Sequence, residues 1–313
     1  MEANKVIVDF ILLVLKAAIP AGTPLLYGTL GEVTAERAGV LNLGVEGMMI
    51  VGAVTAFGVT NSTGNIWLGL AAAALAGGLL ALVHAFASIT LRVNQVVSGL
   101  ALTMLGLGLS GLVGKKFIGM PPRTRFAPLA IPGFSDLPVI GPLLFRYDPL
   151  VYLAIVLAPI LWFMMYKTRW GITLRSVGES PATADALGVN VFLVRYLAVF
   201  FGGLMAGLGG AYLSVVYTTA WIEGMTAGAG WIVIALTIFA LWDPLRAMLG
   251  AYLFGGVRVL QYRLQPLGIS PNLLNMLPFI FTILVLMLST GEVMRRRVGA
   301  PAALMQPYTR EER

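Results

Sequence analysis

The sequence predicts an all-α protein, a polytopic bundle of membrane-spanning helices, and two observations support this fold class. Hydrophobic residues make up 58% of the 313-residue chain, and its mean hydropathy is +0.87. Charged residues make up only 11%, against ~25% in a typical globular domain, which is too few to cover a water-exposed surface of this size. We therefore expect the lipid bilayer to surround most of the chain.

The apolar segments predict the number of spans. Because a helix needs roughly 20 apolar residues to cross the hydrocarbon core, we expect about nine transmembrane helices, within a range of eight to ten. The first segment contains Asp9 and Lys16 and has no clear cleavage site, so we interpret it as a retained span rather than a signal peptide. The segments lie at residues 8–30, 39–60, 67–90, 95–114, 149–166, 195–219, 229–242, 247–264 and 273–290.

The distribution of lysine and arginine predicts the orientation. If the loops alternate sides, one side holds twelve basic residues, including Arg295, Arg296 and Arg297, and the other holds seven. The positive-inside rule then places the C-terminus in the cytoplasm and, with nine spans, the N-terminus outside. We expect one membrane domain over residues 1–294, a Pro-rich external loop at 115–148 and a basic cytoplasmic tail at 295–313.

Cysteine and histidine usage argues against most metal and redox chemistry. The chain has no cysteine and one histidine, His84, so it lacks the ligands of zinc, haem, copper and iron–sulfur sites. We expect no catalytic site and no metal. The net charge of +7 follows from the basic loops on one side of the membrane, so we expect no nucleic acid partner.

Two glycine-rich segments depart from the pattern of plain spanning helices. The first, at residues 39–58, contains Asn42 and Glu46 at membrane depth, and the second, at 223–244, begins with Glu223. Buried carboxylates and irregular backbone occur in membranes where they line a cavity or are covered by protein, and paired interrupted segments suggest an internal repeat around a translocation path. The alternative is that the glycines only allow helices to pack closely.

A polar group opens the fourth apolar segment. Asn94, Gln95 and Ser98 share one helical face, because they are spaced i, i+1 and i+4. They are candidates for lining a polar pathway, together with Asn42 and Glu46. Equally, they are candidates for capping a helix at the membrane surface.

The longest cytoplasmic loop contains a short helix. Ser180 is a suitable N-cap, Pro181 is favoured at the first helical position, and Gly188 suits the left-handed residue that ends a helix. A helix of about two turns is unstable alone, so this segment, at residues 171–190, packs on its own membrane domain or docks into a partner.

Four blocks of the sequence are distinctive, and they occur in the order ERAGVLNLGVEGMMIVGA (36–53), VNQVVSGLALTMLG (93–106), RSVGESPATADALGVNV (175–191) and TAGAGWIVIALTIFALWDP (226–244). These blocks resemble the permease subunits of ATP-binding-cassette (ABC) importers, in the group that serves branched-chain amino acids, ribose and nucleosides. Within that group the chain is most similar to simple-sugar and nucleoside permeases that work with a lipoprotein-type nucleoside-binding protein. The resemblance runs from about residue 17 to 290.

The resemblance implies a set of roles and partners. Asn42 and Glu46 match the family's broken helix, and Arg258 departs from the family, where a neutral or acidic residue is expected. The implied partners are cytoplasmic ABC ATPase subunits, a second permease that is identical or related, and an extracytoplasmic substrate-binding protein. The residues that match the ATPase-coupling motif are Gly178, Glu179, Pro181, Ala184, Asp185 and Gly188.

The function expected from the resemblance is that of a permease subunit in the prokaryotic plasma membrane, which translocates a nucleoside or related simple sugar by alternating access. The chain has no GxxxxGK[ST] phosphate-binding loop, so ATP and Mg²⁺ would be used by the ATPase subunits, and this chain would bind no cofactor and be no enzyme. The alternatives are an ABC permease for another small polar solute, such as a branched-chain amino acid or pentose, and an ion-coupled secondary transporter.

Overall fold

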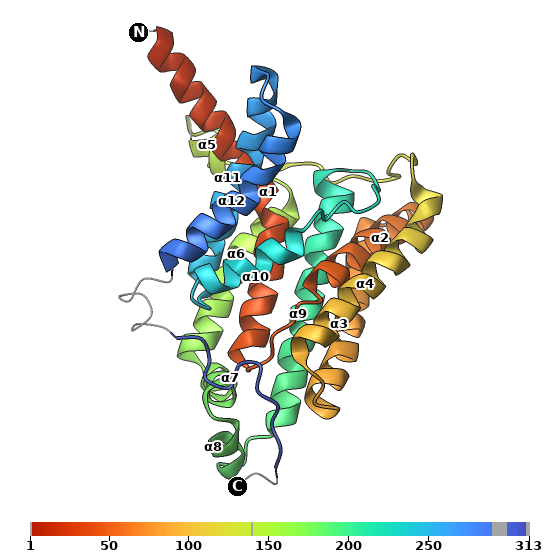
Figure 1. The fold of residues 1–313 in the computed structure, drawn as a ribbon. Helices are drawn as coiled ribbons and strands as arrows, with labels where there is room; N and C mark the ends of the chain where they lie inside the picture. Colours follow the sequence, from red (N-terminus) through yellow and green to blue (C-terminus); the bar gives the residue numbers. More distant parts are fainter. Residues whose placement is uncertain (1, 139, 290–298, 311–313) are drawn as a thin grey trace.

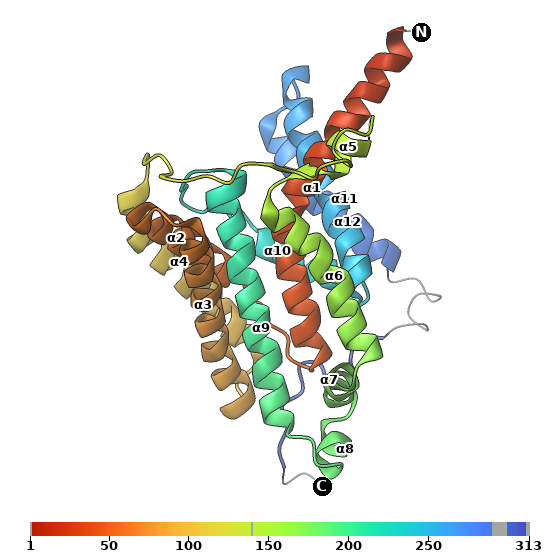
Figure 2. The same cartoon turned by 180° about the vertical axis from the view of Figure 1, so that it is seen from behind.

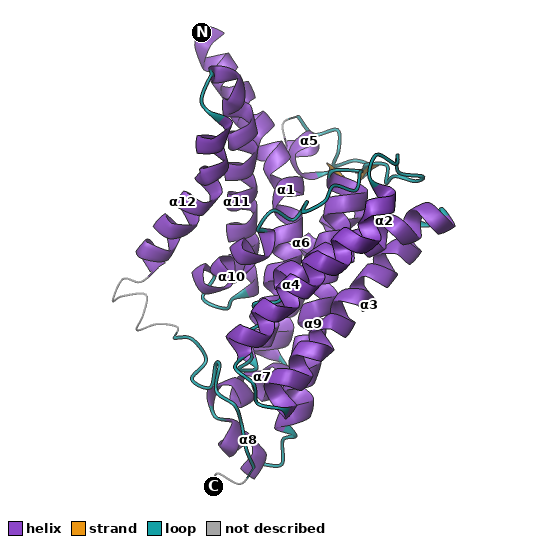
Figure 3. Ribbon diagram, turned by 45° about the vertical axis from the view of Figure 1, so that its right-hand side comes forward, coloured by secondary structure: helices purple, strands orange, loops and turns teal. Residues whose placement is uncertain are grey.

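The computed structural model describes residues 2–138, 140–289 and 299–310, and most of these residues are helical (Figures 1 and 3). The first half of the chain contains four helices and two short helical turns. They are α1 (Glu2–Arg37), α2 (Val45–Thr63), α3 (Ile66–Ala85), η1 (Phe86–Thr90), α4 (Gln95–Gly114) and η2 (Lys115–Phe117).

The second half begins after a small excursion at 118–148. This excursion holds α5 (Ile140–Leu144) and an antiparallel pair of two-residue strands, β1 (Leu129–Ala130) and β2 (Arg146–Tyr147), in which Leu129 faces Tyr147. The following elements are α6 (Pro149–Lys167), α7 (Arg169–Glu179), α8 (Pro181–Ala186), α9 (Val191–Tyr212), η3 (Leu213–Tyr217), α10 (Ala229–Phe239), α11 (Pro244–Leu264), η4 (Gln265–Leu267) and α12 (Pro271–Ser289).

The predicted all-α membrane bundle is confirmed, whereas the count of nine spans is not. Two further apolar helical segments of the described residues, Ala229–Phe239 and Asn272–Leu284, are too short to cross by the same criteria. The first helix also continues to Arg37, beyond the predicted end at residue 30. The described segments that are long and apolar enough to cross a membrane are Phe10–Arg37, Ile66–Thr90, Gln95–Phe117, Pro149–Lys167 and Val191–Tyr217.

The helices form two similar units that run in opposite directions. Helices α1 and α9 pack against each other at the centre, α1 packs on α11 as α9 packs on α3, and α10 contacts α1 and α12 as α2 contacts α9 and α4. Helix α1 runs from the N-terminal end towards α7, and α9 returns from α8 (Figures 1 and 2). The packing therefore pairs α1–α4 with α9–α12, as expected for an inverted repeat.

Most helices of the structure begin with a residue whose side chain caps the helix N-terminus. The carboxylate of Asp148 accepts the backbone N–H of Leu150 at 3.0 Å at the start of α6, and the Asp243 carboxylate accepts that of Leu245 at 3.0 Å at the start of α11. Helices α2 and α10 differ, because their N-cap residues are Gly44 and Gly228, which offer no side-chain cap. The free N–H groups of these two helices need other partners.

Glycines allow α2 and α4 to touch backbone to backbone. A Cβ atom added to Gly106 would lie 2.5 Å from both the Cα and the carbonyl oxygen of Gly47, whereas a Cβ at Gly108 would meet nothing within 4 Å. The contact is possible only without a side chain, as in other closely packed membrane helices. Gly106 and Gly108 of α4 therefore have different roles.

We predict that Gly106→Ala destabilises the protein by about 1–3 kcal/mol, because the new methyl group overlaps backbone atoms that cannot move aside. The matched variant Gly108→Ala should leave stability unchanged or raise it by up to about 1 kcal/mol, since alanine favours the helix. Thermal unfolding of both variants in detergent measures the difference. Equal stability of the two variants would contradict this interpretation of the α2–α4 contact.

Candidate functional site

Two helix N-termini meet inside the bundle. Between α1 and α2 the chain is unwound at residues 38–44, and between η3 and α10 it is unwound at 218–228. Gly228 takes the left-handed conformation, with φ of +82°, and so turns the chain into α10. A Cβ added to Gly230 would overlap the backbone nitrogen and Cα of Glu46, so the first turns of α2 and α10 lie in backbone contact.

The carboxylate of Glu46 is the cap of α10. Its Oε1 accepts hydrogen bonds from the Thr226 hydroxyl at 2.5 Å and the Gly228 backbone N–H at 3.0 Å, and its Oε2 accepts the Gly230 backbone N–H at 2.6 Å. Glu46 also lies in the first turn of α2. One negative charge therefore lies at the positive ends of two helix dipoles.

No cation balances this charge within the described part of the chain. Glu46 is buried, and the ion pairs of the described residues are Arg146 with Asp136 and Arg310 with Asp185. The three hydrogen bonds and the two helix ends supply the compensation instead, as charge-assisted bonds to backbone N–H groups do elsewhere. The carboxylate thus holds the two unwound segments together.

Side chains bond to many backbone groups of the unwound segment at 38–44. Leu41 donates its N–H to Gln95 Oε1 at 2.8 Å, and its carbonyl oxygen lies 3.0 Å from His84 Nε2. Since a carbonyl only accepts, Nε2 carries the imidazole proton, and Nδ1 accepts from the Ser98 hydroxyl at 3.1 Å. Exposed backbone groups would be costly in a bilayer, and these bonds remove that cost.

Asn42 completes the same segment. Its side-chain Oδ1 accepts the Gly44 N–H at 2.9 Å, which forms the tight turn into α2, and its own backbone N–H donates to Glu32 Oε1 at 2.8 Å. Asn42 is fully buried. Thr103 of α4 donates its hydroxyl to the Leu43 carbonyl at 2.9 Å. Asn42, Gln95 and Ser98 therefore belong to the polar groups that hold the segment at 38–44, and Glu46 follows in the first turn of α2.

Asn94 lies apart from these polar groups. It is exposed, and its Oδ1 accepts the N–H groups of Val96 and Val97 at 2.9 and 3.2 Å, as the N-cap of α4. Glu223, the acid of the second segment, is also exposed. The structure thus places Asn42, Gln95 and Ser98 around the unwound segment at 38–44, Glu46 at the junction of α2 and α10, and Asn94 at a helix end.

Two carboxylates that the sequence reasoning missed lie beside the unwound segment. Glu32 and Glu36 are one helical turn apart in α1 and are both buried. Glu36 Oε2 accepts the Trp242 indole N–H at 2.5 Å, and the Arg37 guanidinium donates to the carbonyl oxygens of Leu241 and Trp242. The end of α1 is therefore bound by hydrogen bonds to the turn between α10 and α11. The expected span at 8–30 ends before these acids, so they were not predicted to lie in a helix. Their i, i+4 spacing directly after an apolar segment is compatible with a continued helix and is the signal that the sequence offers.

The segment expected to contact the ATPase forms α7 and α8. Ser180 caps α8, with its Oγ accepting the Thr183 N–H at 3.4 Å, and Gly188 is left-handed at φ of +85°, as the sequence predicted. Within the coupling motif, Gly178, Ala184 and Asp185 are buried, whereas Glu179 and Gly188 are exposed and Pro181 is half-buried. The exposed tip consists of Ala182, Thr183, Ala186, Leu187 and Gly188.

A strap formed by the C-terminal tail, residues 299–310, covers the inner face of these helices. Ala303 donates its N–H to the Gly178 carbonyl at 2.9 Å, and Met305 donates to the Gly39 carbonyl at 3.3 Å. The Arg310 guanidinium lies 3.1 Å from the Asp185 carboxylate, and this hydrogen bond raises the pKa of Arg310. Arg295, Arg296, Arg297 and Arg313 lie outside the described residues.

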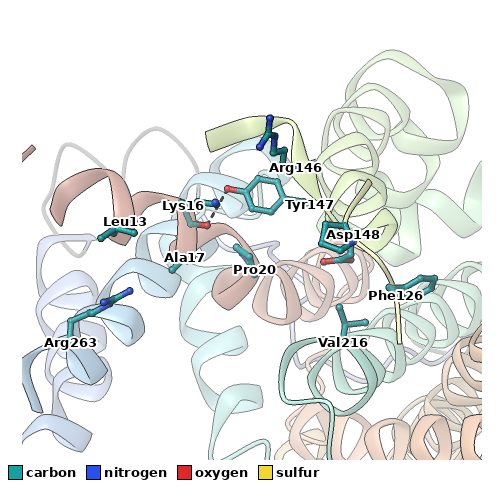
Figure 4. Close-up of a pocket in the computed structure, with 11 residues that line it drawn as sticks. Leu13, Lys16, Ala17, Pro20, Phe126, Arg146, Tyr147, Asp148, Val216 and Arg263 are labelled. Carbon is teal, nitrogen blue, oxygen red and sulfur yellow. Dashed lines mark hydrogen bonds between the residues drawn. The ribbon is translucent and has the colours of Figure 1, made fainter. Parts of the chain in front are cut away.

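A second feature lies at the end of the molecule opposite α8. A cavity of about 450 Å³ is lined by the basic residues Lys16, Arg146 and Arg263 and by Asp148, and the ring of Tyr147 lies beside Lys16 (Figure 4). The Tyr147 hydroxyl donates to the Lys16 carbonyl at 3.1 Å, and burial raises the pKa of Tyr147 to about 12. With three basic residues and the one carboxylate of Asp148, the lining of this cavity carries more positive than negative charge.

Inverted helical units with two broken helices meeting at a buried carboxylate define the class as a polytopic membrane transport protein. The family described as branched-chain amino acid transport system / permease component matches residues 18–286, so the chain belongs to this permease family. Its members are permease subunits of ABC transporters, which in general work with ATPase subunits and a substrate-binding protein. The chain is therefore a transport subunit and not an enzyme.

Three relatives are similar along most of their length. A protein named as a glucose ABC transporter permease, TsgC13 of Haloferax volcanii, is 43% identical over 95% of this chain and 97% of its own. The guanosine ABC transporter permease NupQ of Bacillus subtilis is 37% identical over 98% and 99%. The nucleoside ABC transporter permease NupC of Lactococcus lactis is 34% identical over 86% and 90%. No solved structure shows a significant match to the chain.

We predict that Glu46→Gln weakens the start of α10 by about 1–3 kcal/mol, because one side-chain oxygen becomes an NH₂ group facing a backbone N–H. Hydrogen exchange of the peptide at 223–235 should accelerate, and assembly should remain. Glu223→Gln is the matched control, since that side chain is exposed. Unchanged exchange in Glu46→Gln would show that the carboxylate does not hold the junction.

Proposed function

We propose that this chain is the membrane-spanning subunit of an ATP-driven importer that moves a nucleoside or a related simple sugar. The observation that carries the proposal is the exposed, apolar tip of α8, which is held by the strap on a membrane domain with inverted repeats. Leu187 at this tip is a large apolar side chain that is 81% exposed. The names of the relatives, glucose, guanosine and nucleoside permeases, support the substrate class.

The proposed assembly contains two ATPase subunits, one of which contacts the tip of α8. A second permease, identical or related, lies beside this one. A binding protein docks at the basic end that contains Lys16, Arg146 and Arg263. ATP and Mg²⁺ would be held by the ATPase subunits alone. The strap and α8 would then lie in the cytoplasm, with the C-terminus inside and the molecule in the plasma membrane. In this proposal the tail at 295–313 is not a unit separate from the membrane domain at 1–294, because the strap contacts the coupling segment at 171–190.

The coupling route we propose runs through contacts of the described residues. Movement of α8 reaches α7 directly, and the strap connects Gly178 of α7 to Gly39 of the unwound segment. From there the side-chain bonds of Asn42 lead to α2, and Glu46 leads to α10. Because these contacts are hydrogen bonds and packed backbones, α2 and α10 would move as one element during alternating access.

Uptake by the complete transporter in proteoliposomes tests the function. Labelled nucleosides and glucose should accumulate on the side of the membrane that holds the ATPase subunits when ATP is supplied on that side. A hydrolysis-deficient ATPase subunit should abolish this accumulation. Equal uptake with the deficient subunit would refute ATP coupling. Loss of uptake on adding an uncoupler at constant ATP would favour an ion-coupled transporter instead.

We predict that Leu187→Gln lowers the affinity of the membrane domain for its ATPase by roughly thirtyfold, because burying a leucine side chain is worth about 2 kcal/mol. Substrate-stimulated ATPase activity should fall in parallel. The control is Ile172→Gln on α7, where the wild-type side chain is 60% exposed but lies off the tip. Equal effects of the two substitutions, or no effect of the first, would argue against the tip as the docking site.

A further inference from the structure

A cavity of about 310 Å³ lies beside the start of α10. It is bounded by the first turn of α10, by α11 and by α12, and its lining includes Thr226, Ile232, Arg258, Gln261, Tyr262 and Phe279. This volume is at the lower end of the range for small-molecule sites, which is about 300–1,000 Å³. The cavity shares Thr226 with the cap formed by Glu46.

Arg258 is the charged group of this cavity. It lies on α11, half-buried, with Gln261 and Tyr262 one helical turn further along the same face. Among the described residues its guanidinium forms neither an ion pair nor a side-chain hydrogen bond. An arginine inside an apolar helix is costly, so its retention next to a cavity points to a ligand that supplies hydrogen-bond acceptors.

Phe279 gives the cavity an aromatic wall. Its ring lies against the N-cap of α10, since a Cβ added to Gly228 would be 3.4 Å from the ring carbon Cζ. Ile232 and Pro278 add apolar surface on the same side. A flat, unsaturated ring is the ligand shape that stacks on such a wall.

The chemistry of the lining selects among the possible solutes. Arginine only donates hydrogen bonds, and the carboxylate nearest this side of α10, Glu46, already accepts three. The side chains lining the cavity in the described structure include no carboxylate. The hydroxyl protons of a sugar would have to be accepted by the side-chain oxygens of Thr226, Gln261 and Tyr262, and a single guanidinium would match a phosphate poorly. A heterocycle with two adjacent acceptor atoms fits the planar fork of arginine.

We propose that this cavity binds the base of a 6-oxopurine nucleoside, with the Arg258 guanidinium donating to O6 and N7 and with Phe279 against the ring. The proposal rests on the proposed transport function and names the substrate class and its recognition site. Arginine makes this bidentate contact with the same two atoms of guanine in nucleic acids. Because Thr226 belongs to both the cavity and the Glu46 cap, an occupied cavity would bias the junction of α2 and α10.

The test measures nucleoside binding to the full-length chain, assembled with its partner subunits in nanodiscs. Arg258→Lys keeps the charge but removes the fork, so the affinity for guanosine and inosine should fall about tenfold. Adenosine has an amino group in place of O6, so its affinity should change less than about threefold. Arg246→Lys is the matched control, because Arg246 lies on the same helix, is exposed and does not line this cavity, and it should bind like the wild type.

Equal losses for all nucleosides, no loss for the oxopurines, or no measurable oxopurine binding by the wild type would overturn the proposal. Phe279→Leu should weaken binding of all purines to a similar degree, and a selective effect on guanosine would also contradict the assignment. Uptake separates this inference from the proposed function. If transport requires ATP but Arg258→Lys binds oxopurines normally, the proposed binding site is refuted and the proposed function stands. If Arg258 discriminates between the bases but uptake needs no ATP, the proposed ATP-driven transport is refuted and the binding site stands.

Discussion

A single carboxylate between two helix N-termini is the interaction on which the rest of this structure depends. Helices α2 and α10 begin inside the bundle with glycine N-caps, so neither satisfies its own first N–H groups. Glu46 belongs to one helix and caps the other, which fixes their separation and direction at once. The glycines around it, such as Gly230, are required because any side chain would occupy the space of the Glu46 backbone.

This constraint explains why so many polar groups surround an unwound segment in an apolar protein. Once the chain breaks its helix at residues 38–44 to reach Glu46, each backbone group there must find a partner away from water. Gln95, His84, Glu32 and Thr103 provide these partners from three different helices. The segment is therefore rigidly placed, and its movement requires movement of α1, α3 and α4 together.

The sequence predicted the class of fold, the two interrupted segments and the cap of the coupling helix, because hydropathy, glycine spacing and Ser180–Pro181 are local signals. It did not predict that Glu46 caps α10, since that contact joins residues 180 or more positions apart. The interpretation of Gln95 and Ser98 as pathway or cap was open for the same reason. His84, to which no role was assigned, proved to hold Leu41. The length of α1 was underestimated because burial of Glu32 and Glu36 depends on tertiary partners that hydropathy does not record.

The strap changes how the coupling motif should be understood. Asp185 matches a position expected to contact the ATPase, yet its side chain is only 4% exposed and binds Arg310 of the tail. Gly178 is likewise covered, by the Arg37 carbonyl and the strap. These residues therefore set the position of α8 relative to the unwound segment, and the exposed tip at Leu187 is left to contact a partner. In the coupling route proposed above, a force applied at the tip would reach Gly39 through the strap as well as through α7, which would make the tail part of the path between the ATPase and the broken helices.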